Sequence, residues 1–162
     1  MIVCTLSACA TYGNSIGVSE LKARHSSLTS RIVQVHGWLT PCGFRSCLMV
    51  ESRDYGVWLE QAGALERRMD VRGETSVQFP PPPDRRSGGV SFGSSWSFDR
   101  QVAKLRHSLA EVVVEARVTD ECWSSPAEGK IVICGDRANQ LEPIRLVKVI
   151  QEIPLPSDPE EY

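Results

Sequence analysis

The chain has 162 residues, of which 41% are hydrophobic and 23% are charged, and its 18 Lys and Arg against 20 Asp and Glu give a formal net charge of -2 at pH 7. This size and composition predict one globular domain with a long loop or tail, and they argue against a disordered chain, a collagen-like repeat or a coiled coil. The acidic balance argues against non-specific nucleic-acid binding, and no apolar run reaches the roughly 18 residues of a membrane-spanning helix.

The first predicted elements are a helix and a strand. Ser19 is a typical N-cap and Glu20 suits the first turn, so we expect a helix from Ser19 to about Leu28. Residues 32–39 alternate in polarity, which is typical of a strand with one buried face. One face of this strand carries Val33, Val35, Gly37 and Leu39, and the other carries Gln34, His36 and Trp38.

Two more strands are expected at residues 48–51 and 57–60, with a turn at 53–56 between them. Residues 61–98 then form a predicted excursion from the core. Within it, the four prolines at 80–83 favour a polyproline II segment, and a run rich in Gly and Ser follows. We therefore expect a flexible loop over about residues 70–98.

The second half of the chain predicts a helix, two strands and a hairpin. These elements are a helix at 99–109 capped by Ser97 or Asp99, a strand at 112–119, a hairpin between Cys122 and Cys134, a strand at 143–150 and a Pro-rich acidic tail at 154–162. Five short strands with a helix between the third and fourth is the layout of an OB-fold. The predicted fold is therefore mainly β with short helices, a five-stranded Greek-key barrel preceded by an N-terminal helix.

A pattern of apolar and polar residues extends from about Val18 to Glu152. It consists of Glu20-Leu21 and the segments 31–39, 56–59 and 112–118. In this pattern the chain resembles the OB-fold domains of small bacterial lipoproteins, a family without a defined function. The resemblance implies a domain at residues 19–153 that is a non-enzymatic binding or structural module without a cofactor.

The N-terminal segment has no charged residue up to Ser19 and contains the motif Leu6-Ser7-Ala8-Cys9. This motif resembles the lipobox of bacterial lipoproteins, in which a peptidase cuts before the Cys and the Cys is acylated. The resemblance implies a signal peptide at 1–8, a lipid anchor on Cys9 and a linker at 9–18. Ala10 after the Cys implies the outer membrane, facing the periplasm, with an envelope protein or a small ligand as partner.

The segment before Cys9 departs from a complete signal peptide. It lacks a positively charged n-region, and its apolar stretch covers only Ile2 to Leu6. We interpret Met1 as an internal residue of a longer signal peptide. The alternative is a frayed terminus in which the motif occurs by chance.

Four cysteines remain once Cys4 and Cys9 are set aside. Their spacing favours disulfides that pair Cys42 with Cys47 and Cys122 with Cys134, because each pair flanks a turn-like stretch. Disulfides persist in oxidising compartments such as the periplasm. Two alternatives stay open, a zinc site made of four cysteines and buried free thiols in a cytosolic protein.

No nucleotide-binding Gly loop, nucleophile elbow or paired-His metal motif occurs, so no catalytic residue or metal ligand is predicted. His36 and Trp38, together with Trp58, form a possible ligand face, since an OB barrel binds across its second and third strands. Packing across the strands is the alternative for this group.

The other polar candidates give no pattern. His25 and His107 lie on separate predicted helices, so solvated or capping roles are expected. Three carboxylates gather near the predicted turn, but nothing pairs them at the separation of a glycosidase: Glu51, Asp54 and Glu60.

The alternative function is a cytoplasmic OB-fold protein that binds single-stranded nucleic acid. Residues 84–107 combine basic and aromatic side chains, which single strands require. The basic residues are Arg85, Arg86, Arg100, Lys104 and Arg106, and the aromatic residues are Phe92, Trp96 and Phe98. Export to the envelope would remove this function.

Overall fold

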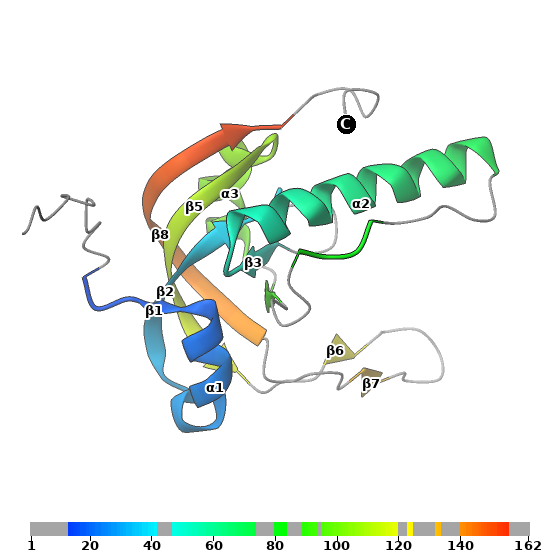
Figure 1. Ribbon diagram of the computed structural model, residues 1–162. Helices are drawn as coiled ribbons and strands as arrows, with labels where there is room; N and C mark the ends of the chain where they lie inside the picture. Colours follow the sequence, from blue (N-terminus) through cyan, green and yellow to red (C-terminus); the bar gives the residue numbers. More distant parts are fainter. Residues whose placement is uncertain are drawn as a thin grey trace, which may run out of the picture.

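The computed structural model describes residues 13–41, 47–73, 80–83, 89–93, 95–119, 123–124, 132–133 and 140–155 (Figure 1). The strands are β1 (Ile16–Gly17), β2 (Ile32–Leu39), β3 (Leu48–Val50), β4 (Val90–Phe92), β5 (Ser108–Thr119), β6 (Trp123–Ser124), β7 (Val132–Ile133) and β8 (Gln140–Pro154). The helices are α1 (Val18–Leu28), α2 (Arg53–Arg72) and α3 (Trp96–Val102), and a 3-10 turn follows at Ala103–Leu105.

Five of these strands close into a mixed barrel. The strands pair in the order β2, β3, β4, β8 and β5, and β5 pairs again with β2. All pairings around the barrel are antiparallel except that of β4 with β8, which is parallel. The short strand β1 adds to β2 in parallel, on the edge that β3 uses further along. The mainly β barrel expected from the sequence is confirmed at this level.

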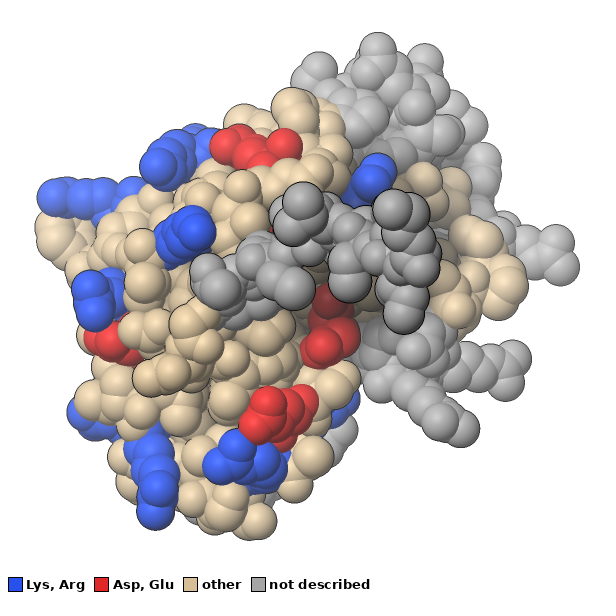
Figure 2. Space-filling view, turned by 60° about the vertical axis from the view of Figure 1, so that its left-hand side comes forward, with Lys and Arg blue, Asp and Glu red and all other residues tan. Residues whose placement is uncertain are grey.

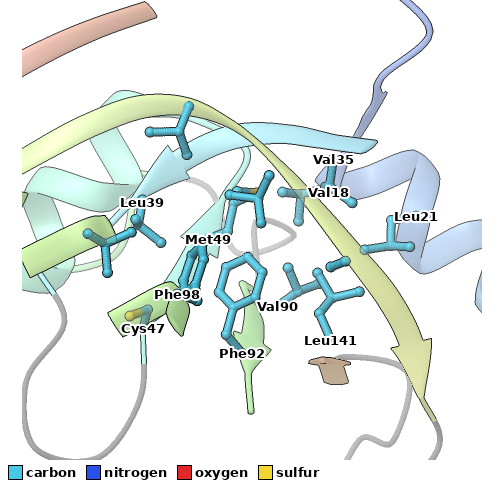
Figure 3. Packing of buried hydrophobic residues seen from close by; sticks show 14 of the residues in the cluster. Val18, Leu21, Val35, Leu39, Cys47, Met49, Val90, Phe92, Phe98 and Leu141 are labelled. Carbon is cyan, nitrogen blue, oxygen red and sulfur yellow. The ribbon is translucent and has the colours of Figure 1, made fainter. Parts of the chain in front are cut away.

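The barrel interior is filled by alternate side chains of the long strands. Val35 of β2 and Val112 and Val114 of β5 are fully buried. Phe98 of α3 is also fully buried, and its ring lies 5.4 Å from that of Phe92 on β4 (Figure 3). Because burial of large apolar side chains is favourable, the packing of Phe98 against the strands holds α3 on the barrel core.

The long strands β5 and β8 bend around the barrel with the help of irregular pairing. Register shifts occur between Glu111 and Val112, between Val113 and Val114, and between Glu115 and Ala116. Each extra residue on one strand bends it and increases its twist. Repeated shifts therefore let one pair of strands wrap the barrel from end to end.

The third barrel strand is not where the sequence predicted it. Residues 57–60 belong to the helix α2, and the third strand is β4, inside the segment predicted as a flexible loop. Gly56, predicted in a turn, lies in α2, at a place where a Cβ would come within 2.8 Å of Leu109 Cδ1. The glycine permits close packing of the helix against the barrel.

Helix boundaries also differ from the prediction. The N-cap of α1 is Gly17 and not Ser19. The predicted helix at 99–109 starts earlier, at Trp96 after the N-cap Ser95, whose Oγ accepts a hydrogen bond from the Phe98 amide. It also ends earlier, since Ser108 already belongs to β5. The closing strand β8 is longer than the expected 143–150.

Two predicted hairpins have the expected paired strands. β2 pairs antiparallel with β3, and β6 pairs antiparallel with β7 through Trp123 opposite Ile133. Across the described parts of the chain, no helix is long and apolar enough to cross a membrane.

Candidate functional site

A groove of about 490 Å³ opens on the outside of the barrel, where β1 and α1 meet β2 and β5. Its apolar lining consists of Ile16, Leu28, Ile32 and Val33. Leu28, the last residue of α1, is buried, whereas Ile32 at the start of β2 keeps 56% of its surface exposed. The apolar part of the lining thus reaches the molecular surface at Ile32.

The polar lining of the groove consists of Asn14, Arg24, Gln34 and Glu115. Arg24 donates to Glu20 one turn earlier on α1, with 2.6 Å between Nη1 and Oε1. Glu115 accepts two hydrogen bonds from Arg145 on β8, of 2.9 and 3.1 Å. These hydrogen bonds from Arg145 are the main cause that lowers the pKa of Glu115, although desolvation acts against them.

A second polar cluster lies where β1 passes into α1. The Ser15 hydroxyl lies 3.3 Å from His36 Nδ1, and the Glu51 carboxylate accepts a 2.7 Å hydrogen bond from the Ser19 amide. A carboxylate at this place satisfies an unpaired amide of the first helical turn and opposes the positive end of the helix dipole. Gly17 provides space for this carboxylate, since a Cβ at position 17 would lie 3.1 Å from Glu51 Oε1. We assign Glu51 to stabilisation of α1.

The residues of the predicted ligand face do not lie on one open surface. Trp38 is 8% exposed and packs with Val50 and Leu109 beside α2. This arrangement corresponds to packing across the strands, the alternative to a ligand face. Trp58 lies on α2, where its Nε1 donates to Pro80 O at 2.8 Å and its ring stacks on Tyr55. His36 stays half-buried in the polar cluster.

The remaining polar candidates are separated from one another. His25 is 9% exposed, and its Nε2 lies 3.0 Å from the Thr119 carbonyl oxygen, so the expectation of a solvated side chain is wrong. His107 is exposed. In the part of the chain that the structure describes, no group of three or more His, Cys, Asp or Glu could hold a metal ion.

Two of the three aromatic residues considered for nucleic-acid binding lie in the core. Phe92 and Phe98 pack against each other inside the barrel. Trp96 is 73% exposed, with the Arg100 guanidinium 3.9 Å from its ring centre. Phe92 and Phe98 failed as surface predictions because their alternation with small polar residues was assigned to a loop, while it belongs to β4 and α3.

The cysteine predictions fall mostly outside the described residues. Cys47 is described and is 4% exposed, directly before β3. Cys9, Cys42, Cys122 and Cys134 lie outside, so the lipid anchor and both disulfide pairings stay predictions.

Sequence reasoning missed the groove. Arg24 and Leu28 have the four-residue spacing of one helix face, and Ile32 and Gln34 alternate on one strand face. Those signals were visible, but the parallel pairing of β1 with β2, which forms one wall, has no local sequence signal.

Comparison with known proteins adds no relative. No protein-family model matches the chain, and neither the curated proteins nor the solved structures give a match.

Proposed function

We propose that this protein is a non-enzymatic bacterial envelope lipoprotein, anchored through an acylated Cys9, whose OB-fold barrel binds a partner at the groove beside α1. The observation that carries the proposal is the position of the lipobox-like motif. It ends at Cys9, and the strand β1 begins at Ile16, seven residues further along the chain. A lipid at Cys9 would therefore be joined to the barrel by a very short linker.

The OB-fold assignment is supported by strand order and by the place of one helix. Counting β2, β3, β4, β5 and β8 as strands one to five, the first three pair in sequence, and the third and fifth pair in parallel. The helix α3 lies between strands three and four and packs its Phe98 into the barrel. These are the features expected of a five-stranded Greek-key barrel of this type.

A binding role is supported by the groove rather than by any catalytic group. Its lining combines four apolar and four polar residues, and in binding sites apolar side chains supply area while a few polar groups fix orientation. The alternative of single-strand binding has less support, because Phe92 and Phe98 are not available as stacking platforms.

Metabolic labelling with radioactive palmitate in a bacterial host tests the lipid anchor. We expect the wild-type protein to carry label in the membrane fraction and the Cys9→Ser variant to lack it. Cys4→Ser is the matched control, since it removes another cysteine of the same segment, and it should keep the label. Equal labelling of wild type and Cys9→Ser would reject the proposal.

A further inference from the structure

The groove lies close to the proposed anchor along the chain. Asn14 lines the groove and follows Cys9 by five residues, so the two Cα atoms can be at most about 18 Å apart even if the linker is fully extended. An acylated Cys9 sits at the membrane surface. The part of the barrel that carries Asn14 would therefore be held next to the lipid headgroups.

The groove exposes an apolar side chain beside an arginine of the neighbouring strand. Ile32 is 56% exposed. Arg117 is its directly opposed partner on β5, so the two side chains share one face of the sheet. An apolar side chain beside a cation suits the boundary between acyl chains and phosphate groups.

The surrounding surface has charges of both signs. Figure 2, which brings the β1 and α1 side forward, shows Lys and Arg spread over the left and lower parts with Asp and Glu among them. Arg24 is paired with Glu20, and Arg117 lies 3.5 Å from Glu142. The face drawn in Figure 2 thus carries charges of both signs. A short tether would make weak local contacts sufficient, because it raises the effective concentration of lipid.

We propose that the mouth of this groove, centred on Ile32, is the membrane-facing surface of the protein and contacts phospholipid, with Arg117 directed toward the phosphate groups. The inference rests on the proposed acylation of Cys9. Single exposed apolar residues are common on soluble domains, so the assignment rests on the position of Ile32 at the groove near Cys9 and not on its exposure alone.

Site-specific photo-crosslinking in the full-length, membrane-inserted protein tests this orientation. Benzoylphenylalanine replaces Ile32 in one protein and Trp96 in another, and adducts with membrane phospholipid are measured by mass spectrometry. Trp96 is the matched control because it is an apolar residue with a larger exposed fraction, 73%, and its helix α3 lies far from α1 (Figure 1). Accessibility alone would therefore favour position 96.

We expect several-fold more phospholipid adduct at position 32 than at position 96. Equal yields, or more adduct at position 96, would overturn the membrane-facing assignment. It would also be overturned if position 32 formed adducts with protein and none with phospholipid. Position 14 gives a second probe at the groove in case the protein substituted at 32 does not fold, and the same result is expected there. The acyl mass on Cys9 is read from the same samples: acylated protein without lipid adducts at 32 and 14 rejects the orientation alone, whereas loss of the acyl mass rejects the anchor as well.

Discussion

Gly37 of β2 lies close to β3 and leaves no room for a side chain. A Cβ at this position would lie 2.8 Å from both Met49 Cγ and Val50 O, and 3.0 Å from Val18 Cγ2. The Val50 oxygen belongs to the backbone and cannot move without disturbing the strand pair. Glycine at position 37 thus provides the space that the neighbouring strand requires.

Gly37→Ala should therefore destabilise the protein by about 1–3 kcal/mol, as expected for overpacking. The measurement is the free energy of unfolding in urea. Gly63→Ala is the control, because its Cβ would meet only the flexible Arg67 side chain, at 3.4 Å, and alanine favours a helix by up to about 1 kcal/mol over glycine. Equal stabilities of the two variants would contradict the close approach of β2 to β3.

Glu60 on α2 illustrates a carboxylate whose burial disfavours its charge. Burial raises the pKa of Glu60 above its ordinary value of 4.5, and attraction to Arg67 acts weakly in the other direction. Above the raised pKa the native carboxylate is ionised and burial lowers the stability of the fold. Below about pH 4.5 the carboxyl group is neutral in both the folded and the unfolded chain, so this penalty is absent.

Glu60→Gln should thus raise the free energy of unfolding at pH 7, and the gain should shrink as the pH falls through the raised pKa of Glu60. Chemical unfolding from pH 4 to pH 8 measures this dependence. Glu66→Gln, at an exposed position of the same helix, should change the stability little at any pH. A Glu60→Gln gain that does not change with pH would contradict the assignment of the effect to the buried charge.

At the scale of elements, the helix α1 depends on a side chain from outside itself. Its N-cap residue Gly17 offers no side-chain hydrogen bond, and the Glu51 carboxylate bonds the Ser19 amide instead. The contact ties the helix to the end of β3. It also holds the α1 wall of the groove in place.

Glu51→Ala should cost about 1 kcal/mol, the usual effect of losing an N-terminal cap. Hydrogen exchange of the Ser19 amide and thermal unfolding both report this loss. The control is Glu20→Ala, which removes an exposed pair with Arg24 on the same helix and should cost about 0.3–0.5 kcal/mol. Unchanged exchange at Ser19 in Glu51→Ala would contradict the capping role.

The long elements could be predicted from the sequence because their burial patterns are local. Alternation along residues 32–39 and 112–118 reflects one face in the barrel interior, and β2 and β5 follow it. The strand β4 is only three residues long, and pairing with β3 and β8 stabilises it. Pairing of this kind depends on distant residues, so no local pattern indicated the third strand.

The helix α2 was missed for a related reason. Tyr55, Val57 and Leu59 alternate as in a strand, but in the structure they pack around Trp38 at the outside of the barrel. Partly buried side chains of this helix therefore give the same short alternation of apolar residues as a strand. The groove could not be predicted from local patterns either, because its two walls come from segments that associate only in the tertiary structure.

At the scale of the whole molecule, two predicted disulfides would each close a hairpin, one between the barrel strands β2 and β3 and one around the separate two-stranded sheet of β6 and β7. Cys47 precedes β3, and Cys122 and Cys134 are the sequence neighbours of the paired residues Trp123 and Ile133. Loops this short give at most about 2–3 kcal/mol in the chain-entropy model. The disulfides would be local staples of a barrel that packs without them.

Reduction should therefore lower the midpoint of unfolding without abolishing folding. Alkylation with and without prior reduction, read by mass, counts the thiols involved, and we expect four additional modified cysteines after reduction. The double variant Cys122→Ser, Cys134→Ser should lose two of them and keep the fold. Four thiols that react before reduction would contradict both disulfides and favour an intracellular protein.

The whole-molecule proposal depends on one covalent event, the acylation of Cys9. Its direct test is the intact mass of the protein purified from the membrane fraction of its natural host. We expect a chain that begins at Cys9 and carries the added mass of acyl chains. A soluble chain that retains Met1 or Ile2 and carries no acyl mass would contradict the lipid anchor and the membrane-facing groove together.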